Sequence, residues 1–412
     1  MKSAHTHYDV VVVGGGMVGA SLCLALVDTP LRVALVEPVL PGSGAQPSFD
    51  DRCTALANGS RRMLETLGAW REIAPQSAAI QTIHVSDAGE FGSARLEAGA
   101  LGLPALGYTA PNRVLGAALW AQLAARSAAG DRLSIMAPAR VISIHDEAGA
   151  VLLEISDAAG ARRSITARLV VAADGERSPV RQAAGVAAGI VDFEQIAIVA
   201  NLAAERPAQG VAYERFAAGA GPLALLPRPD GHYTVVWTVA QIDAAALLAA
   251  SNAAFLAQLQ QVFGWRVGAF TRPGQRASYP LVLSRAERCT AHRTVLVGNA
   301  AQSLHPVAGQ GFNLGLRDAA VLAELIANAT DPGSESVLAA HQQRRARDRQ
   351  RMIGFTDGLL RLFALSFPGA ASLRSLGLML FDGAMPAKRA LSGVSWGFGG
   401  ETPRLLRGLP VC

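Results

Sequence analysis

Two glycine-rich segments of the chain have the spacing that brings backbone N–H groups close to a bound ligand. The first contains Gly14, Gly16 and Gly19 and follows a β-branched run at residues 8–13. The second spans residues 298–318 and also follows a short apolar run. Glycine has no Cβ and tolerates positive φ, so such turns can cradle a phosphate or approach a flat ring. Both segments predict ligand binding between a strand and a helix, although α/β proteins without a ligand also contain glycine-rich turns.

An acidic residue makes the first turn more specific. We expect a helix over residues 20–27 and a second strand over residues 31–36, with Glu37 at the tip of that strand. Strand, G-x-G-x-x-G turn, helix, strand and acid are the parts of a dinucleotide site, where the acid accepts hydrogen bonds from a ribose diol. A carboxylate disfavours a 2′-phosphate, so this site should hold FAD or NAD and not NADP. The alternative is a doubly wound fold that binds no dinucleotide.

The second turn should lead into a helix that begins near Phe312 and Asn313. Apolar residues recur at helical spacing from Leu314 to Ile326. The N-terminus of a helix carries roughly half a positive charge and several unpaired N–H donors. This end would suit a cofactor that becomes negative during turnover, as a flavin ring does when it is reduced.

Polar residues at three other places could extend the site. Asp174 and Gly175 end a buried strand that follows a predicted β-meander over residues 139–168, and ligands of open parallel sheets bind at such carboxyl ends. Arg52 lies in a segment that we expect to open a helix, and Arg113 lies near the start of another helix. Each arginine could reach a ligand phosphate or lie on the surface.

Composition excludes several classes of site. Cysteines occur only at positions 23, 53, 289 and 412 and form no C-x-x-C pair, which argues against metal, iron–sulfur and disulfide sites. Lysine occurs only at positions 2 and 388, so no central amine is available for Schiff-base chemistry. The net charge is +5, but no dense basic run is interleaved with aromatic residues, so we expect no nucleic-acid partner.

A cluster of arginines and a late apolar segment bear on membrane contact. The arginines at positions 344, 345, 347, 349 and 351 are interpreted as the solvated face of a helix, with contact to lipid headgroups as the alternative. Helices over residues 359–381 either pack on the body of the protein or form an apolar doorway for a lipid substrate. No run is long enough to span a bilayer and no signal peptide is evident. We expect a cytoplasmic protein, with peripheral attachment to the inner membrane as a further possibility.

The order of the segments predicts an α/β protein with a Rossmann-like FAD-binding domain, an inserted and mostly antiparallel substrate sheet, and a C-terminal helical region. The FAD-binding domain is predicted to comprise residues 1–75, 106–184 and 281–345, and the substrate domain residues 76–105 and 185–280. Residues 346–412 form the helical region. No second dinucleotide-binding unit is evident, so a nicotinamide cofactor must bind without a domain of its own.

The order of these motifs resembles the FAD-dependent aromatic hydroxylases of the para-hydroxybenzoate hydroxylase fold over nearly the whole chain. Within that class, residues 298–313 resemble the ubiquinone-biosynthesis hydroxylases of the UbiH/VisC type, which act on 2-polyprenyl-6-methoxyphenol. Asn299 stands where the wider class has aspartate, a difference that favours the UbiH-type branch. Residues 85–87, 279–281 and 292–299 are further points of similarity.

The resemblance implies a role for each motif. Gly14, Gly16 and Gly19 would bind the FAD pyrophosphate and Glu37 the adenosine ribose, while Arg52 and Arg113 would contact the outer part of FAD. Asp174 and Gly175 belong to a motif implicated in contact with FAD and NAD(P)H, and Asn299 would bind the ribityl chain. The residues implied to line the isoalloxazine ring are Pro306, Gly309, Gly311 and Asn313. No catalytic base is identified; His305 is a candidate by motif position alone, and a structural role is favoured for it.

The implied activity is that of an FAD-dependent monooxygenase, in which NAD(P)H and O2 hydroxylate the ring of a polyprenylated methoxyphenol during ubiquinone biosynthesis. A membrane surface or a complex of biosynthetic enzymes is a further candidate partner. The alternatives are a hydroxylase of another aromatic compound, a prenyl reductase or halogenase of the same fold, and a flavin-binding scaffold without activity. A halogenase needs an active-site lysine, for which neither lysine is well placed.

Overall fold

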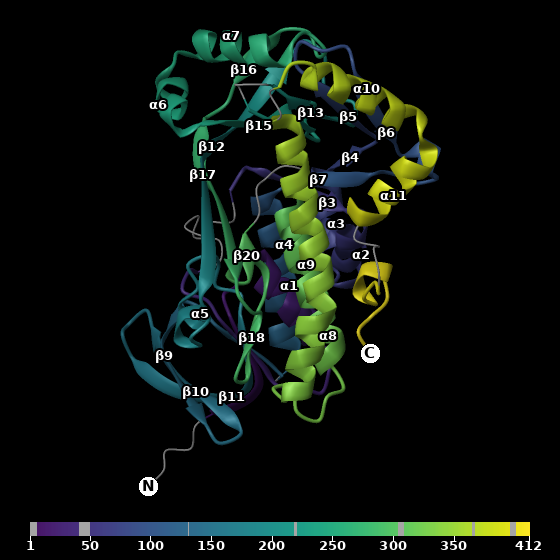
Figure 1. Ribbon diagram of the computed structural model, residues 1–412. Helices are drawn as coiled ribbons and strands as arrows, with labels where there is room; N and C mark the ends of the chain where they lie inside the picture. Colours follow the sequence, from purple (N-terminus) through teal and green to yellow (C-terminus); the bar gives the residue numbers. More distant parts are fainter. Residues whose placement is uncertain are drawn as a thin grey trace.

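Three β-sheets and the helices around them make up the described part of the chain in the computed structural model (Figure 1). The structure describes residues 6–40, 50–130, 132–217, 221–303, 309–364, 367–395 and 401–412. This mixed architecture, with helices at the C-terminal end, confirms the predicted fold class. Figure 1 shows the first sheet at one end of the molecule, the second at the opposite end, and helix α9 (Glu335–Ala364) running between them.

The first sheet has a parallel centre that is buried on both faces. Its strand order is β18-β19-β11-β1-β2-β8, with the hairpin β9–β10 attached to β11. Val10 and Val12 of β1 pack with helices α1, α4 and α8, whereas Val11 and Val13 pack with β9, β10 and α5 on the other face. Burial on both faces explains the continuous apolar run in β1. The strands are β1 (Thr6–Val13), β2 (Val33–Val36), β8 (Leu133–Met136), β9 (Ala139–Glu147), β10 (Ala150–Asp157), β11 (Arg162–Ala172), β18 (Thr290–Ala291) and β19 (Thr294–Leu296). The helices are α1 (Met17–Leu26), α4 (Asn112–Ala129), α5 (Pro179–Ala183) and α8 (Gln310–Ile326).

The second sheet is antiparallel except where β13 pairs in parallel with β5. Its order is β20-β17-β12-β15-β14-β13-β5-β6, and β16 pairs with β12. Leu223 and Leu225 of β14 pack against α6 and α7, whereas Ala224 and Leu226 face the opposite side. The strands are β5 (Thr82–Asp87), β6 (Ser93–Glu97), β12 (Ala188–Ala204), β13 (Val211–Phe216), β14 (Leu223–Pro227), β15 (Tyr233–Ala240), β16 (Phe270–Pro273), β17 (Ala277–Ala286) and β20 (Gln302–Ser303). The two helices are α6 (Gln241–Ala249) and α7 (Asn252–Phe263). The sheet thus joins strands from both predicted parts of the substrate domain, while the exact domain boundaries stay a prediction.

The third sheet corrects one prediction. Residues 51–56 were expected to open a helix, but Cys53–Ala57 form strand β3, which pairs antiparallel with β7. The helix begins only at Asn58. Every side chain of the segment is buried or partly buried, and its backbone pairs with a strand that lies at least 50 positions away in the chain. The elements of this region are α2 (Asn58–Thr66), α3 (Trp70–Ile73), β4 (Ala78–Ile80) and β7 (Gly107–Pro111).

The C-terminal helices connect the two large sheets. Helix α9 has 30 residues and, at ~1.5 Å per residue, a length of about 45 Å. It is followed by α10 (Ala370–Gly383) and α11 (Met385–Ser395). Among the described residues, no helix combines the length and apolar character needed to cross a bilayer.

The arginine cluster on α9 is a solvated face only in part, because Arg347 and Arg351 are exposed whereas two other members are buried. Arg345 and Arg349 are buried, at 3% and 5% exposure, because α9 packs along α8. Arg345 donates to Asp318 at 2.6 Å and to Asp348 at 2.6 Å, and Arg317 of α8 donates to Asp348 at 2.8 Å. The solvated-face interpretation is therefore wrong for these two residues, whose partners sequence spacing could not show.

Replacing Arg345 with methionine should lower the free energy of unfolding by about 3–5 kcal/mol, because the buried carboxylate of Asp318 and the partly buried carboxylate of Asp348 would lose their shared cation. Urea unfolding followed by circular dichroism measures the change. The matched control is Arg126→Met, which removes a half-exposed partner of Asp28 and should cost less than about 1 kcal/mol. Equal losses of unfolding free energy in the two variants would show that a buried ion pair contributes no more to stability here than an exposed one.

The same network should make stability sensitive to acid. Burial alone would raise the pKa of Asp348, but the charges of Arg317 and Arg345 outweigh it and hold that pKa below its ordinary value of 3.8. A carboxyl group whose pKa is lowered by folding stabilises the fold fully above its unfolded pKa, and this contribution is lost as pH falls through the folded pKa. The unfolding free-energy difference between wild type and R345M should therefore shrink below a pH of about 4.

Candidate active site

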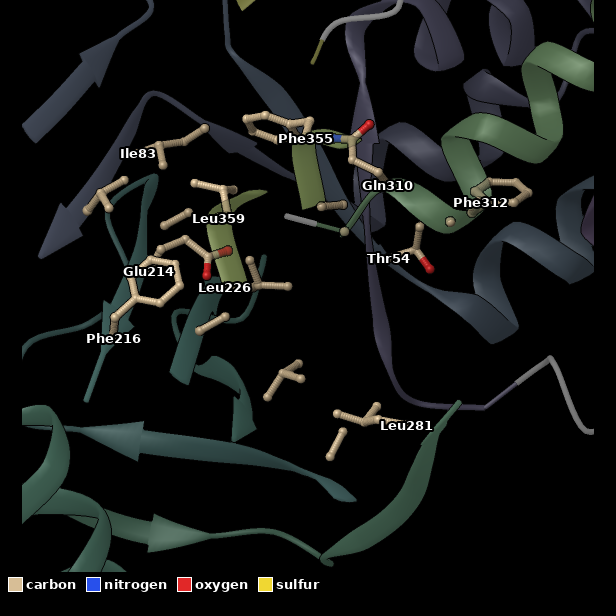
Figure 2. A pocket seen from close by; sticks show the side chains of 18 of the residues that line it. Thr54, Ile83, Glu214, Phe216, Leu226, Leu281, Gln310, Phe312, Phe355 and Leu359 are labelled. Atoms are coloured by element: carbon tan, nitrogen blue, oxygen red, sulfur yellow. The ribbon is translucent and has the colours of Figure 1, made fainter. Parts of the chain in front are cut away.

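A single large cavity lies between the turns of the first sheet and the inner face of the second. Its volume is about 1130 Å³. One part of the wall consists of the turn after β1, the start of β3, the residue pair 175–176 and the N-terminus of α8; the rest comes from the second sheet and from α9 and α10. Figure 2 shows both kinds of wall in one view, with Thr54, Gln310 and Phe312 near the α8 turn and Ile83, Phe216 and Leu226 on sheet strands.

The turn after β1 has no room for side chains at its glycines. Gly14 has φ +106°, and a Cβ there would collide with the carbonyl oxygen of Ala173. A Cβ on Gly19 would collide with the carbonyl oxygen of Gly14, so this glycine lets α1 pack tightly against the turn. Gly16 is the N-cap of α1 and lines the cavity. Of the three glycines, Gly14 and Gly19 therefore allow close packing of the turn, and Gly16 alone lies on the cavity wall.

Glu37 occupies the tip of β2 as predicted and is buried. Its carboxylate accepts hydrogen bonds from the backbone N–H groups of Gly15 and Val39. An ionised carboxylate has about four lone-pair sites, so two remain for a diol. Glu37 therefore has a fixed position and free acceptor capacity, beside the large cavity and not on its wall.

Asp174 and Gly175 lie at the tip of β11, next to the glycine turn. The Oδ2 atom of Asp174 accepts a hydrogen bond from the N–H of Val180 at 3.1 Å, but Oδ1 is buried without a partner among the described residues. Burial raises the pKa of this carboxyl group. Gly175 has φ +87° and open space where a Cβ would lie. Gly175 lines the cavity and Asp174 does not, so this corner offers a ligand the open space at the glycine, while Asp174 links the tip of β11 to the start of α5.

The α8 turn forms the opposite side of this end of the cavity. Asn299, which follows β19, is exposed and on the cavity wall. Gly309 is the N-cap of α8 with φ +60°, and Gly311 has open space around its Cα. Helix α8 has 17 residues, so its N-terminus presents a substantial partial positive charge to the cavity.

Asn313 lies close to this wall but its amide is fully engaged. Its Oδ1 accepts from the N–H of Ala57 at 2.9 Å, and its Nδ2 donates to the carbonyl oxygens of Ala55 and Gly309 at 2.9 and 3.0 Å. Asn313 therefore fixes β3 to the start of α8. Its implied contact with the flavin ring stays a prediction. Pro306 and His305 lie outside the described residues.

The two candidate arginines differ in their positions. Arg52 lines the cavity, pairs with Asp50 and lies 4.0 Å from the centroid of the Tyr279 ring. Arg113 pairs with Asp51 and its side chain is 53% exposed, away from the cavity wall. Of the two, the structure brings only Arg52 to the cavity.

The site also contains residues that sequence patterns alone did not identify. The second sheet contributes an apolar wall of small and branched side chains, and α9 contributes Phe355, Leu359 and Phe363. Glu214 of β13 stands within this wall. The alternation in Val211–Phe216 places Glu214 on the same face as Ala212 and Phe216, which is the one signal that could have drawn attention to it.

Taken together, the polar end of the cavity fits FAD. The tight glycine turn puts Gly16 on the cavity wall, where backbone N–H groups can approach a pyrophosphate, Glu37 offers acceptors for a ribose, and Gly175 leaves open space on the same wall. The exposed amide of Asn299 and the N-terminus of α8 lie on the same cavity wall and could hold a ribityl chain and a ring.

Comparison with known proteins agrees with this geometry. Residues 7–356 match the protein family described as "FAD binding domain". The chain is 37% identical to ubiquinone hydroxylase UbiL of Rhodospirillum rubrum, covering 99% of this chain and 95% of that protein. It is 31% identical to the 3-demethoxyubiquinol 3-hydroxylase of Escherichia coli, covering 92% and 96%. The crystal structure of p-nitrophenol 4-monooxygenase PnpA from Pseudomonas putida has a TM-score of 0.77 at 21% identity, covering 94% of this chain and 97% of that one. This last likeness shows the fold.

Gly14→Ala should give folded protein whose flavin content is lower by a factor of about ten or more. The added Cβ collides with the backbone and the positive φ adds strain of about 1–3 kcal/mol, so the turn is displaced. Flavin absorbance per protein after gel filtration measures the loss. Gly149→Ala is the matched control. Gly149 lies in the β9–β10 hairpin and also has a positive φ, of +79°, but no atom lies within 4 Å of the place where a Cβ would be. Normal flavin content in G14A would show that the turn does not hold the cofactor.

Proposed function

This chain belongs to the family of FAD-dependent ubiquinone-biosynthesis hydroxylases, and on that premise we propose that it uses NAD(P)H and O2 to hydroxylate the ring of a polyprenylated methoxyphenol. The observation that carries the proposal is the shape of the cavity. One continuous space joins the residues that fit FAD to a long apolar wall built from the second sheet and α9. A small aromatic substrate would need only the first part, whereas a prenyl tail needs both.

Bound FAD would accept a hydride from NAD(P)H and activate O2 for transfer of one oxygen atom to the ring. The protein's own contribution is to bind and orient. The N-terminus of α8 would place partial positive charge beside a flavin ring held at this end of the cavity, and Arg52, which is paired with Asp50, lines the same end. The apolar wall excludes water from the reacting atoms, which limits wasteful release of reduced oxygen.

Purified, FAD-loaded protein should consume NAD(P)H and O2 when a methoxyphenol with a short prenyl tail is added, and should form a ring-hydroxylated product. Product mass and the ratio of NAD(P)H consumed to product formed are the measurements. Consumption without any ring-hydroxylated product would contradict the proposal. Consumption of NAD(P)H without O2, accompanied by reduction of the tail, would instead identify a prenyl reductase.

We further propose that helix α10 rests on a membrane surface at the entrance of the cavity. Leu376 and Leu380 are 50% and 67% exposed and point away from the cavity, while Leu373 is both 61% exposed and on the cavity wall. Exposed apolar residues thus continue directly into the apolar cavity. A substrate with a polyprenyl tail resides in a bilayer, so this continuity gives the tail a path that avoids water.

Replacing Leu376 and Leu380 with serine should weaken binding to vesicles of phosphatidylethanolamine and phosphatidylglycerol by at least about tenfold, because each buried leucine contributes about 1.5–3 kcal/mol. Co-sedimentation measures binding, and turnover of a soluble, short-tailed phenol should be unchanged. Ile242→Ser is the control, since Ile242 is 87% exposed and belongs to α6, which lies on the opposite side of the second sheet region from α10 in Figure 1. Equal vesicle binding by wild type and the double variant would exclude α10 as the contact.

A further inference from the structure

One carboxyl group interrupts an otherwise apolar row across the inner face of the second sheet. Paired positions run from Ala94 through Val85 and Glu214 to Ala224, and then through Val236 to Val199. All six residues line the cavity. Five of them are alanine or valine, so Glu214 is the single polar residue in a row built from small apolar side chains.

Glu214 has no partner among the described residues, although the other ionisable groups on the described cavity wall do. Those pairs are Arg52 with Asp50, Tyr279 with Asp50, Cys53 with Arg228, Glu176 with Ser303, and Arg374 with Asp87. Burial without any compensating charge raises the pKa of Glu214 to about 8. A carboxyl group without a partner in an apolar wall is costly for the fold, which makes Glu214 a candidate for contact with a ligand.

The surroundings of Glu214 leave space for a ring. Two of its neighbours on the sheet are small: Ala212 is two positions before it on β13, and Ala224 lies beside it on β14. Phe216, two positions after it, borders this space with an aromatic ring. Figure 2 shows its carboxyl oxygens directed into the cavity between Leu226 and Leu359. The apolar side chains around it can contact the faces of an aromatic ring, while the carboxyl group is the polar atom pair within reach of a ring substituent.

We propose that Glu214 binds the phenolic hydroxyl group of the substrate and accepts its proton. The inference rests on the proposed function, because it assumes a phenol in this cavity. It adds a specific residue for substrate recognition and ring activation.

The proton transfer balances within the substrate and Glu214. The phenolic O–H bond breaks, an O–H bond forms on the carboxylate, and the electron pair left on the phenolate oxygen raises electron density at the ortho and para carbons. After the ring has gained oxygen and lost its ring proton, Glu214 returns the proton to the phenolate oxygen of the product. With its pKa, about one carboxyl in ten is ionised at pH 7, and a pKa near the working pH is favourable for proton transfer.

The test compares a short-tailed methoxyphenol with its O-methyl ether, which cannot donate a proton. Binding is measured by the change in the flavin absorbance spectrum, and turnover by product formed. Wild type should bind the phenol more tightly than the ether. Glu214→Leu should retain FAD, lose up to about tenfold in phenol affinity because the hydrogen bond between the hydroxyl group and the carboxyl group is removed, and bind both compounds alike.

Glu214→Gln separates binding from proton transfer. The amide can still hydrogen-bond the phenol but cannot accept its proton, so phenol affinity should stay within a few fold while turnover falls about 100-fold. Glu97→Gln is the matched control, because Glu97 is an exposed carboxylate on β6 whose side chain points away from the cavity. Its flavin content, affinity and turnover should equal those of wild type.

Two results would overturn the inference, and a third would remove its premise. If E214L prefers the phenol over the ether as wild type does, Glu214 does not bind the hydroxyl group. If E214Q turns over at the wild-type rate, Glu214 does not accept the proton. If wild type itself binds and hydroxylates no phenol, the proposed function fails, which is distinguishable because the failure is then seen without any substitution.

Discussion

The buried carboxylate of Asp318 is the interaction on which the arrangement of the site depends. Its Oδ2 atom accepts hydrogen bonds from the N–H of Gly298 at 3.1 Å and from the Nε2 of Gln302 at 2.9 Å, and its Oδ1 atom accepts from the Nε of Arg345 at 2.6 Å. One side chain of α8 therefore fixes the turn after β19 and the position of α9 together. Since such a buried charge is stable only with all its partners, the turn and the long helix are held in a single arrangement.

Helix α9 extends from the end of the molecule that holds Asp318 to the end that holds the second sheet. Its first half packs on α8, beside the residues that fit FAD, and its second half supplies Phe355, Leu359 and Phe363 to the cavity wall. The position of the apolar wall relative to the cofactor end is thus set by one rigid element of about 45 Å. This explains why cofactor binding and the reception of a long apolar substrate can occur in one cavity.

The second sheet separates stability from function by the alternation of its strands. Leu223 and Leu225 face α6 and α7 and form a core, while Ala224 and Leu226 face the cavity. Small residues on the inner face leave the space, and the carboxyl group of Glu214 is placed in it at a cost that the outer core offsets. A polar group without a protein partner inside an apolar wall is typical of a ligand-binding site.

The sequence by itself determined the strand–turn–helix units with Gly14, Glu37 and Asp174, the antiparallel second sheet, the helical C-terminal region and the family, because these depend on local spacing. The tertiary structure alone decided four other features: the strand over Cys53–Ala57, the burial of Arg345, the role of Asn313 as a link to β3, and the place of Glu214 in the cavity. Each depends on a partner far away in the chain, such as Ala57 for Asn313, 256 positions apart. Such partners leave no periodic signal in the sequence, since only folding brings them together.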